Sequence, residues 1–180
     1  VNLMESIESG DITRRLKALA GLKDDLVDTV GGPMPKNTSR VLLQIMKDLV
    51  RAKGEPEHQL KLAHDFRIAA FGKPRAIRHL LDHYHLLEMP EEWNQITFDD
   101  HVHDANTSGR KSATHLIMDA WIKGIRSLRV IYYHYIEPKC ALELIEAARI
   151  MEIDLRIGIE FWPLHRDRYI SFIWVSRGLP

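Results

Sequence analysis

Two histidines separated by a single valine, His101 and His103, lie in the segment DDHVHDANTSGRKS, residues 99–112 of this 180-residue chain. Residues two apart on a strand point to the same side, so both imidazoles can face one point. His134 and Glu160 follow downstream. Neutral imidazole with carboxylate is a natural ligand set for Zn²⁺, Mn²⁺ or Fe²⁺. These four residues are candidate metal ligands, and a metal there would acidify a bound water and polarise a phosphoryl or carbonyl oxygen.

The elements that must position these residues are predicted in the second half of the chain. Alternating or β-branched segments predict strands at residues 96–103, 127–135, 154–161 and 168–176, and amphipathic patterns predict helices at 112–124 and 137–152. The order β-α-β-α-β-β predicts a mainly parallel sheet with right-handed crossovers. The four candidate ligands then fall near the ends of the first three strands, where ligands gather in such sheets.

The first half of the chain has a helical pattern. Apolar residues recur at spacings of three and four, which predicts helices over residues 11–30, 38–54, 55–72 and 73–90. Asp11 is the expected N-cap of the first helix, and glycine and proline separate the segments. We therefore expect a small all-helical domain at 1–95, followed by an α/β domain at 96–180.

Composition limits the function classes only broadly. Lysine plus arginine equal aspartate plus glutamate, 25 of each, so bulk charge does not indicate a polyanionic partner. No stretch approaches the roughly 18 apolar residues of a membrane span, and Val1–Gly10 does not read as a secretory signal. The single cysteine, Cys140, cannot form an internal disulfide, which fits a reducing compartment. We expect a cytoplasmic protein without a membrane partner.

The order of these motifs resembles the PHP family, the polymerase and histidinol phosphatase superfamily of metal-dependent phosphoesterases. The resemblance covers roughly residues 96–176. It rests first on an H-x-H motif, His101-Val102-His103, and on the loop Thr107-Ser108-Gly109 that follows it. The next helix, Ser112 to Gly124, has Leu116 and Ala120 in family positions. A strand-end histidine in Tyr132-Tyr133-His134 and a G-x-E motif, Gly158-Ile159-Glu160, complete the resemblance.

This resemblance implies part of a distorted (β/α)₇ barrel, up to three metals, and hydrolysis of a phosphate ester by metal-bound hydroxide. It implies that one or two divalent cations (Zn, Mn or Fe) are held by four ligands, of which the last two are also catalytic: His101, His103, His134 and Glu160. Arg110 and Lys111, in the loop after H-x-H, are candidates to pair with substrate phosphate. The implied substrate is a phosphorylated small molecule or a nucleotide.

Three departures from the family pattern favour an alternative. Tyr133 replaces the acid of the usual T-D-H, and Ser108 runs directly into Gly109 without the loop acid. The remaining family ligands have no counterpart before Pro180, and Ser171 stands near the place of a histidine in many members. Either the missing ligands lie beyond Pro180 or the domain is degenerate, and Tyr133 favours the second. The alternative is a degenerate, non-catalytic PHP-derived scaffold or regulatory domain that binds a protein or nucleic acid. A truncated barrel also leaves an open sheet edge, where we expect a missing C-terminal segment, a partner chain or self-association.

Other polar groups are interpreted as structural. His79 and His83 lie four apart on a predicted helix, but no third zinc ligand is evident. No histidine lies at a spacing from Cys140 that would indicate a catalytic base, which argues against a nucleophilic role for this cysteine. A modest basic patch is diluted by nearby acids and is expected to be an ordinary charged face: Arg67, Lys73, Arg75 and Arg78.

Overall fold

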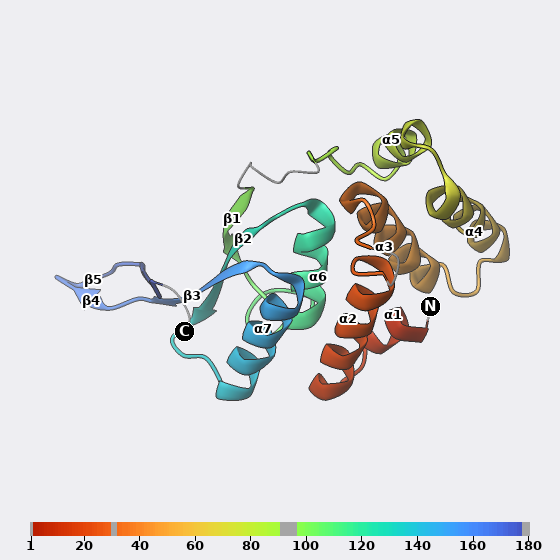
Figure 1. Ribbon diagram of the computed structural model, residues 1–180. Coiled ribbons are helices and arrows are strands. Elements are labelled where there is room, and N and C mark those ends of the chain that lie inside the picture. The colour runs from red at the N-terminus through yellow and green to blue at the C-terminus, as the bar shows by residue number, and fades with distance from the viewer. Residues whose placement is uncertain (1, 30–31, 91–96, 178–180) are drawn as a thin grey trace. The chain divides into compact units, whose positions relative to one another are not determined.

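The computed structural model describes residues 2–29, 32–90 and 97–177 (Figure 1). The chain divides into two compact units, residues 1–95 with 121–124, and residues 96–120 with 125–180. Within the described residues the fold is mixed α/β, with seven helices, a four-stranded sheet and a two-stranded sheet. None of the described helices is long and apolar enough to cross a membrane.

The first unit contains the helices α1 (Asn2–Ile7), α2 (Ile12–Leu26), α3 (Lys36–Arg51), α4 (Pro56–Phe71) and α5 (Pro74–His83). The Asp11 carboxylate accepts hydrogen bonds from the backbone N–H groups of Thr13 and Arg14, as expected for the N-cap of α2. Helix α1 was not predicted. Helix α5 ends well before residue 90, because His85 has a positive φ of 54° and turns the chain out of the helix.

Helix α3 supplies much of the apolar core of this unit through fully buried aliphatic side chains, Val41, Leu42, Leu43 and Ile45. Arg40 is also fully buried, and its Nη1 donates hydrogen bonds to Asn37 Oδ1 at 2.8 Å and to the Leu87 carbonyl at 2.7 Å. Burial lowers the pKa of its guanidinium to about 10. The buried arginine therefore ties α3 to the chain that follows α5.

The second unit contains β1 (Phe98–Val102), α6 (Ala113–Lys123), β2 (Ser127–Tyr133), α7 (Pro138–Met151), β3 (Asp154–Phe161) and β6 (Phe172–Val175). The strand order is β1-β2-β3-β6, with β1, β2 and β3 parallel and β6 antiparallel to β3. Figure 1 shows α6 and α7 on the same side of this sheet, as two successive right-handed crossovers require. The mainly parallel sheet is confirmed, and it is compatible with part of an α/β barrel.

The two faces of the sheet differ because side chains alternate along each strand. On β2, Leu128, Val130 and Tyr132 share one face and are buried. The opposite side, which we call the open face, carries the alternate residues of β2 and β3, Arg129, Ile131, Tyr133, Arg156, Gly158 and Glu160, of which Ile131 and Gly158 are themselves buried. The candidate site lies on this open face.

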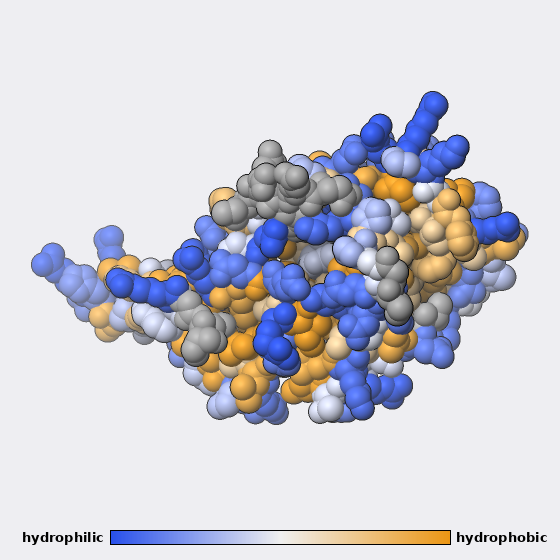
Figure 2. Space-filling model, viewed as in Figure 1, coloured by the Kyte–Doolittle hydropathy of each residue, from blue (hydrophilic) through white to orange (hydrophobic). Residues whose placement is uncertain are grey.

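A hairpin of two short strands, β4 (Leu164–His165) and β5 (Arg168–Tyr169), separates β3 from β6. Its two turn residues, Arg166 and Asp167, both have positive φ, which matches the twist of a two-residue hairpin. Figure 2 shows hydrophilic side chains at the hairpin tip, at the left, beside apolar ones. The single strand predicted at 168–176 is therefore wrong, because the chain divides it between β5 and β6.

Candidate functional site

The two histidines of the H-x-H motif meet at the end of β1. His101 Nε2 lies 3.2 Å from His103 Nε2, and the ring centroids are 5.0 Å apart. His103 Nδ1 lies 2.8 Å from the Ile131 carbonyl oxygen. A carbonyl can only accept, so Nδ1 carries the proton, and the lone pair of Nε2 faces His101 Nε2 and Tyr133 Oη. The backbone of β2 therefore selects the tautomer of His103 that can bind a metal through Nε2.

The separation of the two Nε2 atoms fits two ligands of a single ion. Nitrogens bound at roughly 2.0–2.1 Å to one cation lie about 2.8–3.4 Å apart, the lower end for octahedral and the upper end for tetrahedral geometry. The observed 3.2 Å falls in this interval. An irregularity in the pairing of β1 with β2, between Asp99 and Val102, accompanies this placement. Bulges of this kind commonly re-aim side chains beside functional sites.

Tyr133, the last residue of β2, points at the histidine pair. Its Oη lies 3.4 Å from His103 Nε2 and 3.3 Å from Ser108 Oγ. The Tyr133 and His103 rings are 5.0 Å apart at the centroids. A phenolic oxygen therefore stands beside the two imidazole nitrogens, and Ser108 of the following loop contacts that oxygen.

The other two candidate ligands lie nearby but are engaged differently. The His134 backbone N–H donates to the Glu160 carbonyl at 2.8 Å, and the His134 ring packs edge-on against Trp162. Ser171 Oγ donates a hydrogen bond to Glu160 Oε1 at 2.6 Å, so Ser171 contacts a candidate ligand. Among the described residues, no group of three or more His, Cys, Asp or Glu is placed to hold a metal ion. The structure brings His101 and His103 together and leaves His134 and Glu160 outside that pair.

Asp104 is a residue of this site that the sequence reasoning missed. It is fully buried, and its carboxylate accepts a 2.5 Å hydrogen bond from Tyr132 Oη and a 2.9 Å bond from the Asn106 N–H. Its carbonyl oxygen accepts the Gly109 N–H at 2.9 Å. Burial, followed by the Asp104 hydrogen bond and charge, raises the pKa of Tyr132 well above its usual range. The D-x-N pattern was the available signal, because such residues bond their own loop backbone.

Two glycines of the motifs have a steric role. A Cβ on Gly109 would lie 2.1 Å from the His103 carbonyl oxygen, so only glycine permits the loop to approach the histidine so closely. A Cβ on Gly158 would lie 2.5 Å from Ile131 Cδ1, because the isoleucine side chain crosses β3 at that position. Ile131 also supplies the carbonyl that orients His103. Gly109 therefore supports the position of the histidine pair, and Gly158 leaves room for the Ile131 side chain.

The two predicted phosphate-binding residues have different surroundings. Arg110 is exposed in the loop after the H-x-H motif. Lys111 Nζ forms an ion pair with the largely buried carboxylate of Asp119 on α6. Charge at Lys111 is therefore partly neutralised within the protein, whereas Arg110 is open to solvent.

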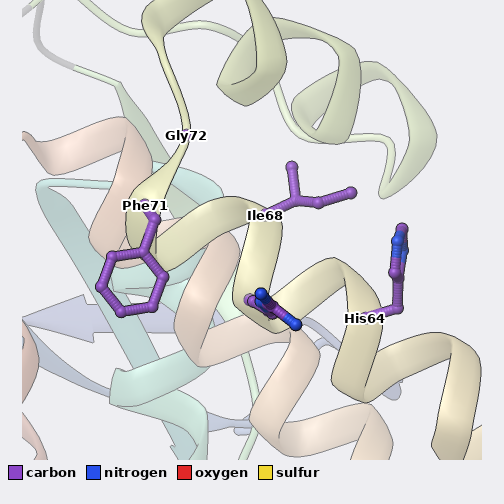
Figure 3. Close-up of a pocket in the computed structure, with 5 residues that line it drawn as sticks. His64, Ile68, Phe71 and Gly72 are labelled. Atoms are coloured by element: carbon purple, nitrogen blue, oxygen red, sulfur yellow. The ribbon is translucent and has the colours of Figure 1, made fainter.

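The first unit has a cavity of about 450 Å³ along α4, shown in Figure 3. It is lined by one stripe of that helix and the residue after it, His64, Arg67, Ile68, Phe71 and Gly72. His64 and Ile68 project from the same side of the helix in this view, and Phe71 lies farther along toward Gly72. One basic and one imidazole side chain on a single exposed helix face do not form a reaction centre.

Comparison with known proteins adds no identification. No protein-family model, no curated protein and no solved structure matches this chain. The site must therefore be interpreted from its own residues.

Proposed function

We propose that the second unit is a PHP-like metal-dependent phosphoesterase, built as part of a distorted (β/α)₇ barrel and preceded by a helical domain. The observation that carries this proposal is the 3.2 Å separation of His101 Nε2 from His103 Nε2. The proton of His103 Nδ1 is held by the Ile131 carbonyl, which leaves Nε2 as a ligand. Both imidazoles stand at the carboxyl end of a parallel sheet, where such sites are expected.

The remaining roles follow from what surrounds the pair. A bound Zn²⁺, Mn²⁺ or Fe²⁺ would lower the pKa of a coordinated water and polarise a phosphoryl oxygen. We assign Glu160 as an acceptor for the proton of the attacking water, with Ser171 Oγ orienting its Oε1. His134, whose ring is exposed beside Trp162, is assigned to protonate the leaving oxygen.

The substrate class follows from the same proposal. A phosphorylated small molecule or nucleotide, in a cytoplasmic setting, fits a site with an exposed Arg110 on the loop after the histidine pair. Arg110 would meet substrate phosphate with its guanidinium, which suits bidentate recognition of phosphate oxygens. Lys111 would contribute only if it exchanged its partner Asp119 for the substrate.

Metal retention tests the proposal directly. The double variant His101→Ala with His103→Ala should lose bound Zn²⁺ or Mn²⁺, measured by elemental analysis after desalting, whereas the wild-type chain retains it. The double variant His79→Ala with His83→Ala is the matched control, because it removes two exposed histidines from α5. Unchanged stoichiometry in the first variant would reject the histidine pair as a metal site.

Measurement of phosphoester hydrolysis distinguishes the proposed enzyme from a non-catalytic scaffold. With added Mn²⁺ or Zn²⁺, hydrolysis of a phosphomonoester such as p-nitrophenyl phosphate should fall by about 10²-fold or more in Glu160→Gln, the range expected for loss of a general base. The matched control is Glu152→Gln, an exposed residue at the end of α7. Turnover that persists in Glu160→Gln would refute the assigned role of Glu160.

A second candidate function is a non-catalytic PHP-derived scaffold or regulatory domain that binds a protein or nucleic acid. The observation that favours it is Tyr133, whose phenol oxygen stands 3.4 Å from His103 Nε2 where the PHP-like pattern has an acid. The prediction for this function is metal retention without turnover of any phosphoester. Turnover restored by Tyr133→Asp would indicate that the tyrosine is what disables the site.

A further inference from the structure

A second concave site lies on the amino-terminal part of the sheet, next to the histidine pair: Asp100, which lines it, directly precedes His101. It is a cavity of about 240 Å³ lined by residues of β1, β2 and β3, namely Phe98, Asp100, Ser127, Leu128, Arg129 and Arg156. Arg129 precedes Tyr133 by four residues on the same face of β2. Ile131, whose carbonyl contacts His103, is only two residues from Arg129, so at about 3.3 Å per residue Arg129 lies roughly 7 Å along the strand from the contact between the histidine pair and β2.

Two arginines face each other across adjacent strands in this cavity. Arg129 of β2 and Arg156 of β3 are direct partners in the parallel register. Neighbouring strands lie about 4.8 Å apart, so both side chains leave the sheet on the same face and side by side. Like charges placed directly opposite destabilise a sheet. This arrangement therefore favours a counter-charge between the two guanidinium groups.

The protein supplies only part of that counter-charge. Arg129 Nη2 lies 3.5 Å from Asp100 Oδ1, and the Asp100 side chain is 58% exposed. Arg129 Nε is buried and has no hydrogen-bond acceptor within the part of the chain that the structure describes. Arg156 is exposed. Among the residues that line the cavity, one exposed carboxylate therefore stands against two guanidinium groups, and a second carboxylate, Asp154, accepts a 3.1 Å hydrogen bond from the lining residue Ser127.

We propose that this cavity binds a phosphate group between Arg129 and Arg156. A dianion matches two cations, and the planar guanidinium fork suits the tetrahedral oxygens of phosphate. The volume lies below the roughly 300–1,000 Å³ of drug-sized ligand sites, so it fits a phosphate group or a small phosphomonoester. Phe98 gives the cavity an apolar wall for the organic part of such a ligand. This site does not depend on the proposed phosphoesterase activity.

Titration of the full chain with inorganic phosphate and with glycerol 3-phosphate tests the proposal, by calorimetry and by ³¹P line broadening. EDTA is present so that a metal at the histidine pair contributes nothing. We expect Arg156→Gln to weaken binding of either ligand at least tenfold, with an unchanged thermal unfolding curve because Arg156 is exposed. Arg168→Gln, in the exposed hairpin, is the control and should bind as the wild type does.

Two further variants test the roles of Asp100 and of the histidine pair in phosphate binding. Asp100→Asn should strengthen phosphate binding several-fold, because it removes the carboxylate that competes for Arg129 and repels the anion. The double variant His101→Ala with His103→Ala should bind phosphate as the wild type does. Equal affinity in the wild type and Arg156→Gln, or no binding by the wild type, overturns the proposal. Acetate binding as tightly as phosphate overturns the assignment to a phosphate group.

Discussion

At the scale of single residues, the candidate site depends on buried polar groups that satisfy one another. The carboxylate of Asp104 is removed from solvent and is held by Tyr132 Oη at 2.5 Å and by Asn106. A buried carboxylate that loses a donor keeps its desolvation cost without compensation. Tyr132 and Asp104 therefore anchor β2 to the loop that directly follows His103.

Removal of the Tyr132 hydroxyl should destabilise the second unit. We expect Tyr132→Phe to lower the free energy of unfolding by about 1–3 kcal/mol, because Asp104 keeps its burial and loses its shortest hydrogen bond. Urea unfolding followed by circular dichroism gives the value. Tyr135→Phe is the control, since Tyr135 is 75% exposed, and its effect should stay within about 0.5 kcal/mol. Equal losses in the two variants would contradict the anchoring role.

At the scale of elements, the loop from β1 to α6 is a compact turn that positions the histidine pair. The Ala105 N–H donates to the Lys111 carbonyl at 2.7 Å, which closes the loop on itself. The Gly109 N–H donates to the Asp104 carbonyl, and the glycine packs directly on the His103 carbonyl. The absence of a Cβ at Gly109 is therefore what permits the loop to close beside His103.

Addition of one methyl group at Gly109 should open this loop. The new Cβ of Gly109→Ala would lie 2.1 Å from backbone oxygen, which cannot move as a side chain end can. We expect a loss of about 1–3 kcal/mol of unfolding free energy, as for other overpacked positions, and weaker metal retention by the histidine pair. Gly10→Ala is the control, because its Cβ would meet no atom within 4 Å. Unfolding free energies from urea titration that fall equally in both variants would contradict the steric argument.

At the scale of the second unit as a whole, the sheet has exposed apolar surface at its β6 edge. Phe172, Ile173 and Trp174 are 50%, 43% and 57% exposed, and no charged residue lies within β6. An edge strand without charges can pair with another chain, because its outward N–H and C=O groups have no partner. We expect this edge to be covered by another segment or by self-association.

A charge on the edge should suppress pairing between copies. Ile173→Lys is expected to lower the fraction of dimers and larger species, measured by size-exclusion chromatography with light scattering over a range of concentrations. The control is Leu142→Lys, which places the same charge on an exposed leucine of α7. A strictly monomeric wild-type chain at all concentrations would refute self-association through β6.

Local sequence patterns predicted most of the helices and strands but did not predict the residues at which they end. Asp11 caps α2 as predicted because an N-cap is decided by neighbouring atoms. The predicted helix over 73–90 stops at His83, where a left-handed residue, His85, follows. The hairpin β4–β5 and the antiparallel direction of β6 were not predicted, since pairing partners lie outside any local window.

By itself, the sequence determined which residue types stand at the strand ends and that His101 and His103 share one side. Only the tertiary structure decided which of the four candidate ligands converge. His103 is oriented by a carbonyl of a different strand, Tyr133 enters from β2, and Asp104 is held by Tyr132. These contacts join residues about 30 positions apart, so they depend on strand register and burial, which spacing along the chain does not encode.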